Sequence, residues 1–151
     1  MLAAAAGNAL AAGGCAHGPT VAAAVIPPLP PGRARIWIYR DYIPSDSLNM
    51  AAVSINGATA GYAQPGGGAF YRDVPPGRYR ITVDSYGKDT DQSANLDLAA
   101  GQQAYVKIES LRAWTSAGVE SEIERDTFYA RQVEPQLALA EMASVSYYGG
   151  S

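Results

Sequence analysis

The sequence predicts an all-β fold: a single antiparallel β-sandwich of about seven or eight strands with a short C-terminal helix. Short runs in which apolar and polar residues alternate recur between residues 34 and 133. Clusters of glycine, proline and asparagine separate these runs, as at Asn56-Gly57 and Pro75-Pro76-Gly77. Alternation of period two places every second side chain on a buried face, and such clusters supply the turns between strands.

The clearest strand follows the stiff turn at residues 75–77. The two prolines fix φ, and the glycine allows the chain to adopt a positive φ. Residues 78–83 then alternate strictly between polar and apolar side chains. We therefore expect Tyr79, Ile81 and Val83 to face the core of the sandwich.

The same reasoning gives the other elements in chain order. The remaining expected strands cover residues 34–40, 50–55, 58–64, 69–73, 93–98, 103–111 and 127–133. Asn56-Gly57 is a strong signal for a type I′ hairpin, so the strands on either side of it should pair. Residues 112–125 are expected to form a long loop. Pro135 suits the first turn of a helix over residues 136–142, after which we expect a frayed tail.

The first 32 residues carry no charge, because all 25 Asp, Glu, Lys and Arg residues lie at or after Arg33. Residues 2–12 form an apolar run that is too short to span a bilayer but matches the hydrophobic region of a secretory signal peptide. Ala12-Gly13-Gly14-Cys15 resembles the lipobox of bacterial lipoproteins, in which the cysteine is lipidated. We expect a signal peptide over residues 1–14 and a lipid at Cys15.

A charge-free spacer follows the cysteine. Four prolines within residues 27–31 favour an extended polyproline II conformation. The expected organisation is a lipidated, Ala/Pro-rich tether over residues 15–32, the sandwich domain over 33–135, and the helix and tail over 136–151. Resemblance to lipoprotein sorting in Gram-negative bacteria, with Ala16 after the cysteine, implies a periplasm-facing protein anchored in the outer membrane.

Composition argues against several classes of function. A net charge of −3 and a pI of about 5.0 argue against a nucleic-acid partner, which requires a basic patch. The single cysteine excludes an internal disulfide bond, and the single histidine, His17, lies outside the expected domain. Neither a His/Cys metal cluster nor a Ser-His-Asp triad is therefore expected. We expect no cofactor and no enzymatic activity.

Four segments occur in an order that resembles the bacterial lipoprotein family of the domain of unknown function 2846 type. They are residues 33–40, the Ile55-Asn56-Gly57 hairpin, residues 74–79 and residues 98–106. Proline-proline-glycine followed by alternating residues is also similar to transthyretin-like and carboxypeptidase-regulatory-like sandwiches. The resemblance covers roughly residues 33–142. It implies a small envelope or secreted β-sandwich and supplies no catalytic residues.

Two acidic stretches invite a cation-binding interpretation. Residues 89–97 alternate oxygen-bearing side chains, but Ala94 and Ala100 occupy the positions where an EF-hand calcium loop needs Gly and Glu. Four carboxylates recur at period two and would share one face of a strand: Glu120, Glu122, Glu124 and Asp126. That face would either hold a hard cation or form an acidic edge that prevents aggregation, and mutual repulsion favours the edge.

Aromatic side chains suggest a different kind of site. The sheet face opposite the core would be lined by Trp37, Tyr39, Tyr71 and Tyr105. If exposed, this aromatic face would suit a sugar or a protein partner; otherwise the helix or the long loop covers it. Four arginines would either form an anion site or pair with acidic residues on neighbouring strands: Arg35, Arg40, Arg78 and Arg80.

These observations favour a lipid-anchored envelope protein whose non-catalytic sandwich acts as a binding or structural module. Its partners would be the membrane, through Cys15, and an envelope protein. One alternative is an accessory subunit that docks on a larger envelope complex through the aromatic face. Another is a carboxylate-based hydrolase of an envelope polymer, which would use the acidic run.

Overall fold

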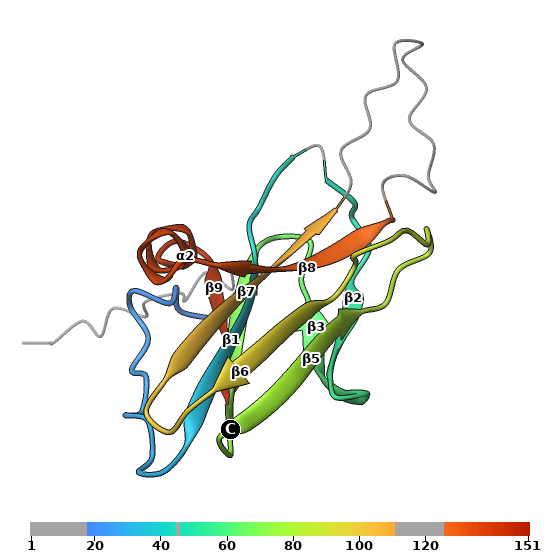
Figure 1. Cartoon of the computed structure of the whole chain (residues 1–151). Helices are drawn as coiled ribbons and strands as arrows, with labels where there is room; N and C mark the ends of the chain where they lie inside the picture. The colour runs from blue at the N-terminus through green and yellow to red at the C-terminus, as the bar shows by residue number, and fades with distance from the viewer. Residues whose placement is uncertain (1–17, 45, 111–125) are drawn as a thin grey trace, which may run out of the picture.

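The computed structural model describes residues 18–44, 46–110 and 126–151, within which the chain forms nine strands and one helix (Figure 1). The strands are β1 Ala34–Arg40, β2 Ala51–Ile55, β3 Ala58–Ala63, β4 Gly68–Val74, β5 Gly77–Val83, β6 Ala94–Leu98, β7 Gln103–Ser110, β8 Phe128–Val133 and β9 Ser146–Gly150. The helix is α2, Pro135–Met142. The predicted all-β sandwich with a short C-terminal helix is confirmed.

The strands form two sheets that pack face to face. Sheet A has the order β8-β7-β1-β4-β9, and sheet B has the order β3-β2-β5-β6. The core between them consists of the inward side chains of both sheets, with fully buried Ile36, Ile38, Val53, Ile81 and Val106 at its centre. The alternation in the sequence predicted this core because each strand places every second side chain toward the opposite sheet.

The local signals for turns also hold. Asn56 and Gly57 both have positive φ, 49° and 83°, as a type I′ turn requires, and β2 pairs antiparallel with β3. After the turn at Pro75 and Pro76, β5 buries Ile81 and exposes Arg78 and Arg80.

Two strand pairings are parallel, β1 with β7 and β4 with β9, whereas the predicted sandwich is antiparallel throughout. The reason for the first is the turn that returns the chain from sheet B to sheet A. Within this turn Gly101 N donates to Arg33 O at 2.7 Å, and Arg35 N donates to Gln102 O at 3.0 Å. Strand β7 therefore begins beside the start of β1 and runs in the same direction.

The C-terminal residues are part of the sandwich, which corrects the expectation of a frayed tail. Strand β9 pairs with β4 and forms one edge of sheet A. Gly150 permits this pairing because a Cβ atom there would lie 2.1 Å from the Tyr71 ring. The glycines of the tail, which suggested flexibility, instead allow a close approach between β9 and an aromatic side chain.

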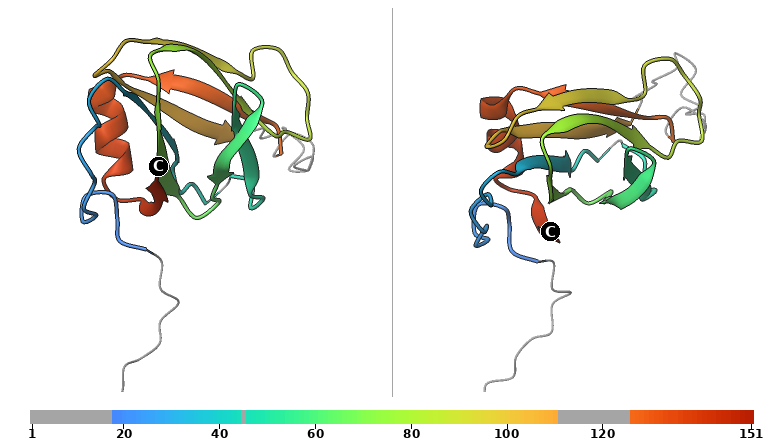
Figure 2. Two further views of the ribbon diagram at one scale, coloured as in Figure 1. Left: turned by 90° about the horizontal axis from the view of Figure 1, so that it is seen from below. Right: turned by 60° about the horizontal axis from the view of Figure 1, so that its bottom comes forward.

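Residues 18–32 are likewise not a free tether. Tyr147 N donates to Pro19 O at 2.8 Å, and Val21 N donates to Val145 O at 3.0 Å. Both views in Figure 2 show this segment beside α2, on the same side of the sandwich. Together, residues 18–32 and 135–145 form what we call the outer layer, which covers the face of sheet A opposite the core. The folded unit therefore extends beyond the expected boundaries of 33 and 135 at both ends.

Candidate functional site

The aromatic face predicted as an interaction surface is a second hydrophobic core. Trp37, Tyr39, Tyr71 and Tyr105 do lie on the face of sheet A opposite the main core, but none is more than 6% exposed. The outer layer covers them with Ala138, Met142 and Val145, and with the partly buried Val21 and Ile26. Sheet A is apolar on both faces and must be covered on both. The four aromatic residues are therefore unavailable to a partner.

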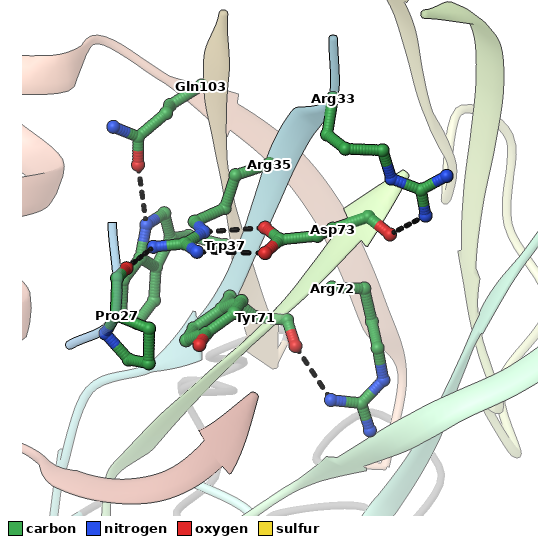
Figure 3. Close-up of polar contacts among 8 residues, drawn as sticks. All are labelled: Pro27, Arg33, Arg35, Trp37, Tyr71, Arg72, Asp73 and Gln103. Atoms are coloured by element: carbon green, nitrogen blue, oxygen red, sulfur yellow. Dashed lines mark hydrogen bonds and ion pairs between the residues drawn. The ribbon is translucent and has the colours of Figure 1, made fainter. Parts of the chain in front are cut away.

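Arg35 fastens the proline-rich segment to this second core (Figure 3). Its guanidinium, 3% exposed, donates to both carboxylate oxygens of Asp73 at 2.6 and 2.8 Å. A further N–H donates to the carbonyl oxygen of Pro27 at 2.8 Å, and the group lies 3.8 Å from the centroid of the Tyr71 ring. The hydrogen bonds to Asp73 raise the pKa of Arg35. A planar guanidinium can meet the carboxylate, the carbonyl and the ring at once, which a lysine cannot do.

Neighbouring polar groups in the second core are also satisfied. Trp37 Nε1 donates to Gln103 Oε1 at 3.1 Å (Figure 3). Burial, followed by a hydrogen bond with Tyr71, raises the pKa of Tyr147 to about 12, so that phenol is neutral at physiological pH. The second core is therefore packed and hydrogen-bonded like a structural interior.

A cluster of charged residues lies at the border of the second core, beneath α2. Lys107 Nζ contacts Asp41 Oδ2 at 2.7 Å and Glu141 Oε1 at 2.9 Å, with Glu109 Oε1 at 3.9 Å. Tyr39 OH donates to the other oxygen of Glu141 at 2.6 Å. Asp41 also lines two adjacent cavities, of about 370 and 520 Å³. Because each charged group here already has a partner of opposite charge or a hydrogen-bond donor, the cluster fixes α2 and is not poised for proton transfer.

The pKa values in this cluster follow from its pairing. Burial opposes the charge on Glu141, but hydrogen bonds from Tyr39 and Lys107 outweigh it and lower the pKa of Glu141. Burial likewise opposes the charge on Lys107, but hydrogen bonds to Asp41 and Glu141 outweigh it and raise the pKa of Lys107. Burial and the hydrogen bond to Glu141 raise the pKa of Tyr39 well above its ordinary value. The ionised pair is thus the stable form around neutral pH.

We expect this cluster to contribute most to the stability of the fold at pH values between the pKa of Glu141 and the pKa of Lys107. The folded pKa of Glu141 is lowered, so its contribution is present above the unfolded pKa and is lost as the pH falls through the folded value. The folded pKa of Lys107 is raised, so its contribution is present below the unfolded pKa and is lost as the pH rises through the folded value.

The measurement is urea unfolding of the wild type and of Glu141→Gln across the pH range. The substitution should cost about 1–3 kcal/mol at neutral pH, and the difference should vanish in acid once Glu141 is protonated in the wild type. Gln136→Glu, an exposed change on the same helix, serves as the control. A Glu141→Gln penalty that is the same at every pH would contradict the assignment.

The four arginines considered as an anion site do not come together. Arg35 pairs with Asp73, and buried Arg40 donates to the carbonyl oxygens of Ser47 and Asn49. The remaining two lie on the exposed face of sheet B, where Arg78 reaches Asp97 at 3.5 Å and Arg80 donates to Ser93 Oγ at 3.3 Å. Each of the four thus contacts its own surroundings within the protein, and Nε of buried Arg40 has no hydrogen-bond partner among the described residues.

Of the acidic run, Asp126 is described, whereas Glu120, Glu122 and Glu124 lie outside the described residues, as does Cys15. The Asp126 carboxylate accepts hydrogen bonds from Ser47 Oγ and, at 2.7 Å, from Asn49 Nδ2. It therefore holds the loop that joins β1 to β2. Within the described ranges, no group of three or more His, Cys, Asp and Glu side chains is arranged to hold a metal ion.

An open groove lies at one end of the sandwich. It is lined by residues at the start of β2, on β3, just after β5 and around the start of β8. Its volume is about 610 Å³, and two exposed aromatic side chains line it, Tyr62 at 50% and Tyr86 at 74% exposure. Met50 adds a third exposed apolar side chain, and Asp84 adds a carboxylate. Exposed aromatic and apolar side chains beside a few polar groups are typical of a binding surface. We call this feature the tyrosine groove.

Sequence reasoning missed the tyrosine groove and the lysine cluster for the same reason. Tyr62 falls on the solvent face of β3, and Tyr86 lies beyond the end of β5, so neither belongs to a local motif. Lys107 shares a strand face with Tyr105 and would have indicated the cluster only if the cover of that face had been known. Strand pairing and the placement of α2 bring these residues to their partners.

Comparison of the chain with protein-family models, curated proteins and solved structures gives no match. The likeness to the domain of unknown function 2846 type therefore stays a prediction.

Proposed function

We propose that this chain is a lipid-anchored envelope protein whose non-catalytic sandwich binds a partner protein in the tyrosine groove. The observation that carries the proposal is the exposure of Tyr62, Tyr86 and Met50 around one groove, while the four aromatic residues predicted as the interaction face are buried. Exposed aromatic and methionine side chains gathered on one surface are enriched at protein interfaces.

The charge distribution favours binding over catalysis. In the cluster around Lys107 and Glu141, the charged groups are already engaged with one another beneath α2. In the tyrosine groove, the Asp126 carboxylate is already engaged by Ser47 and Asn49. The hydrolase alternative depends on Glu120, Glu122 and Glu124, and no observation on the described residues favours it.

The anchor is proposed from the sequence around Cys15. Among the described residues no helix is long and apolar enough to cross a bilayer. A lipidated cysteine would supply the attachment, since each buried methylene of an acyl chain contributes about 0.8 kcal/mol. We propose the outer membrane as the site and the periplasm as the compartment that the sandwich faces. The accessory-subunit alternative would have to use the tyrosine groove, because the aromatic face is covered.

Metabolic labelling with palmitate tests the anchor. The wild type should incorporate label and fractionate with membranes, and Cys15→Ala should lose both, because no other cysteine can replace it. Cys15→Ser, which preserves a small polar residue, provides a second variant. Label retained on either variant would contradict lipidation at this position.

Photo-crosslinking in the native host tests the groove. A photoreactive phenylalanine analogue at Tyr62 or Tyr86 should capture one defined envelope protein, and the same analogue at exposed Asn95 on β6 should not. Replacing both tyrosines with alanine should weaken binding of the captured partner by about tenfold or more, since buried interface aromatics each contribute above about 1 kcal/mol. Equal capture at all three positions, or capture at Asn95 alone, would overturn the groove as the binding surface.

A further inference from the structure

We propose that the outer layer lies directly on the surface of the lipid bilayer and turns the tyrosine groove away from it. This inference rests on the proposed lipidation of Cys15. It adds an orientation, because it assigns the membrane to one face of the sandwich and the protein partner to another.

The first argument is the length of chain available between the lipid and the fold. Gly18 is the third residue after Cys15, and three residues span at most about 11 Å when fully extended. Pro19 is already fixed, since its carbonyl oxygen accepts the Tyr147 N–H at 2.8 Å, and Thr20 forms a bridge with Ser146. A lipid at Cys15 would therefore hold the β9 edge of sheet A and the adjoining outer layer close to the bilayer.

The second argument is charge. Residues 18–32 contain no charged side chain, and residues 135–151 contain one, Glu141, which is paired with Lys107. Charged side chains resume at the borders of the layer, at Arg33 and exposed Glu134. A surface without charged side chains can approach the lipid headgroups and lose its hydration water without leaving a charge desolvated and unpaired. The two segments that make up the outer layer therefore contribute no unpaired charged side chain to the side where the lipid would attach.

The third argument is exposed apolar surface. Val25 is 93% exposed, although the segment around it is packed on sheet A, and Leu137 and Leu139 on α2 are both more than half exposed. A bilayer interface accommodates such side chains, which bulk water does not favour. Exposed apolar residues of the layer are separate from those of the tyrosine groove, so the sandwich carries two such surfaces.

Because the outer layer is fixed to the sandwich, contact between this layer and the bilayer would set the orientation of the whole domain. Arg35 and Asp73 hold residue Pro27, and the Lys107 cluster holds α2. Tyr62 and its partner Ala52 lie on the face of sheet B that points away from the core. With sheet A toward the membrane, this groove would be open to a partner in the periplasm.

The test is paramagnetic broadening in a membrane. The full-length lipoprotein, isotopically labelled, is placed in nanodiscs of phosphatidylethanolamine and phosphatidylglycerol that contain a lipid with a nitroxide headgroup. We expect the amide signals of Val25 and Leu139 to lose most of their intensity, while those of Arg80 and Asn95 on sheet B keep theirs. Equal broadening of both faces, or stronger broadening of sheet B, would overturn the orientation.

A charge variant and its matched control distinguish contact of the outer layer with the bilayer from attachment through the lipid alone. Val25→Glu combined with Leu139→Glu should reduce the broadening of the outer layer severalfold, whereas Tyr62→Glu, a change in the groove at a residue as exposed as Leu139, should leave it unaltered. Preserved signal dispersion shows that the variants are folded. Broadening of the layer that is unchanged in the double variant would contradict a contact through its apolar side chains.

Failure of the anchor is distinguishable from failure of the orientation. If palmitate labelling shows no lipid on Cys15, the full chain is coupled through this single cysteine to a maleimide lipid in the same nanodiscs. One-sided broadening would then still support the orientation while the natural anchor is rejected. Broadening of both faces with either kind of anchor would overturn the orientation, whatever the palmitate labelling shows.

Discussion

Arg35→Ala should destabilise the protein by about 3–5 kcal/mol, because it leaves the largely buried Asp73 carboxylate without its partner. In the folded protein Arg35 also supplies the hydrogen bond to the Pro27 carbonyl and the contact with the Tyr71 ring. Its removal should therefore loosen residues 18–29 as well as lower the free energy of unfolding. Urea unfolding measures the second effect, and amide hydrogen exchange of this segment measures the first.

Arg78→Ala is the matched control. Its partner is Asp97, at 3.5 Å, and the two side chains are 89% and 76% exposed. Exposed pairs contribute about 0–1 kcal/mol, so this variant should be nearly as stable as the wild type. A double variant, Arg35→Ala with Asp73→Ala, should recover part of the loss because no unpaired charge remains. An Arg35→Ala penalty no larger than that of Arg78→Ala would refute the role assigned to Arg35.

Met142→Ala should cost about 2–5 kcal/mol, the usual range for truncation of a fully buried large side chain. Met142 is the last residue of α2 and is completely buried in the second core, together with Ala138 and Val145. Its truncation should leave a cavity between α2 and the aromatic side chains on sheet A. The loss should appear in the main unfolding transition, since the outer layer and sheet A share this core.

Leu139→Ala on the same helix is the comparison, because Leu139 is 52% exposed. A surface change of this kind usually alters stability by about 0.5 kcal/mol or less. Equal effects of the two truncations would mean that α2 is not anchored through Met142. A separate early transition in the Met142 variant would mean that the outer layer unfolds on its own.

Three segments have a structural role that differs from the one predicted from the sequence. The proline-rich segment is a cover, the tail contains a strand, and the aromatic face is a core. The first and the third follow from one property of sheet A: its strand β1 is buried on both faces along its whole length. A strand of that kind needs a second layer, and the chain supplies it from its two ends.

The sequence by itself determined the fold class, the eight strands from residue 34 to residue 133, the helix and the Asn56-Gly57 hairpin. These features depend on residues close together in the chain: alternation of period two, proline and glycine at turns, and a proline in the first helical turn. The core positions Ile36, Ile38, Ile81 and Val106 follow from the same alternation. The expectation of a lipid at Cys15 is also local and stays a prediction.

Only the tertiary structure decided what covers sheet A and which residues face solvent. Alternation shows that Trp37 and Tyr39 share a face, but it does not reveal that residues from both ends of the chain lie over them. Arg35 and Asp73 are far apart in sequence, as are Tyr62 and Tyr86, and each pair meets through strand pairing and sheet packing. Burial and groove formation depend on such long-range contacts, and no local pattern of residues encodes them.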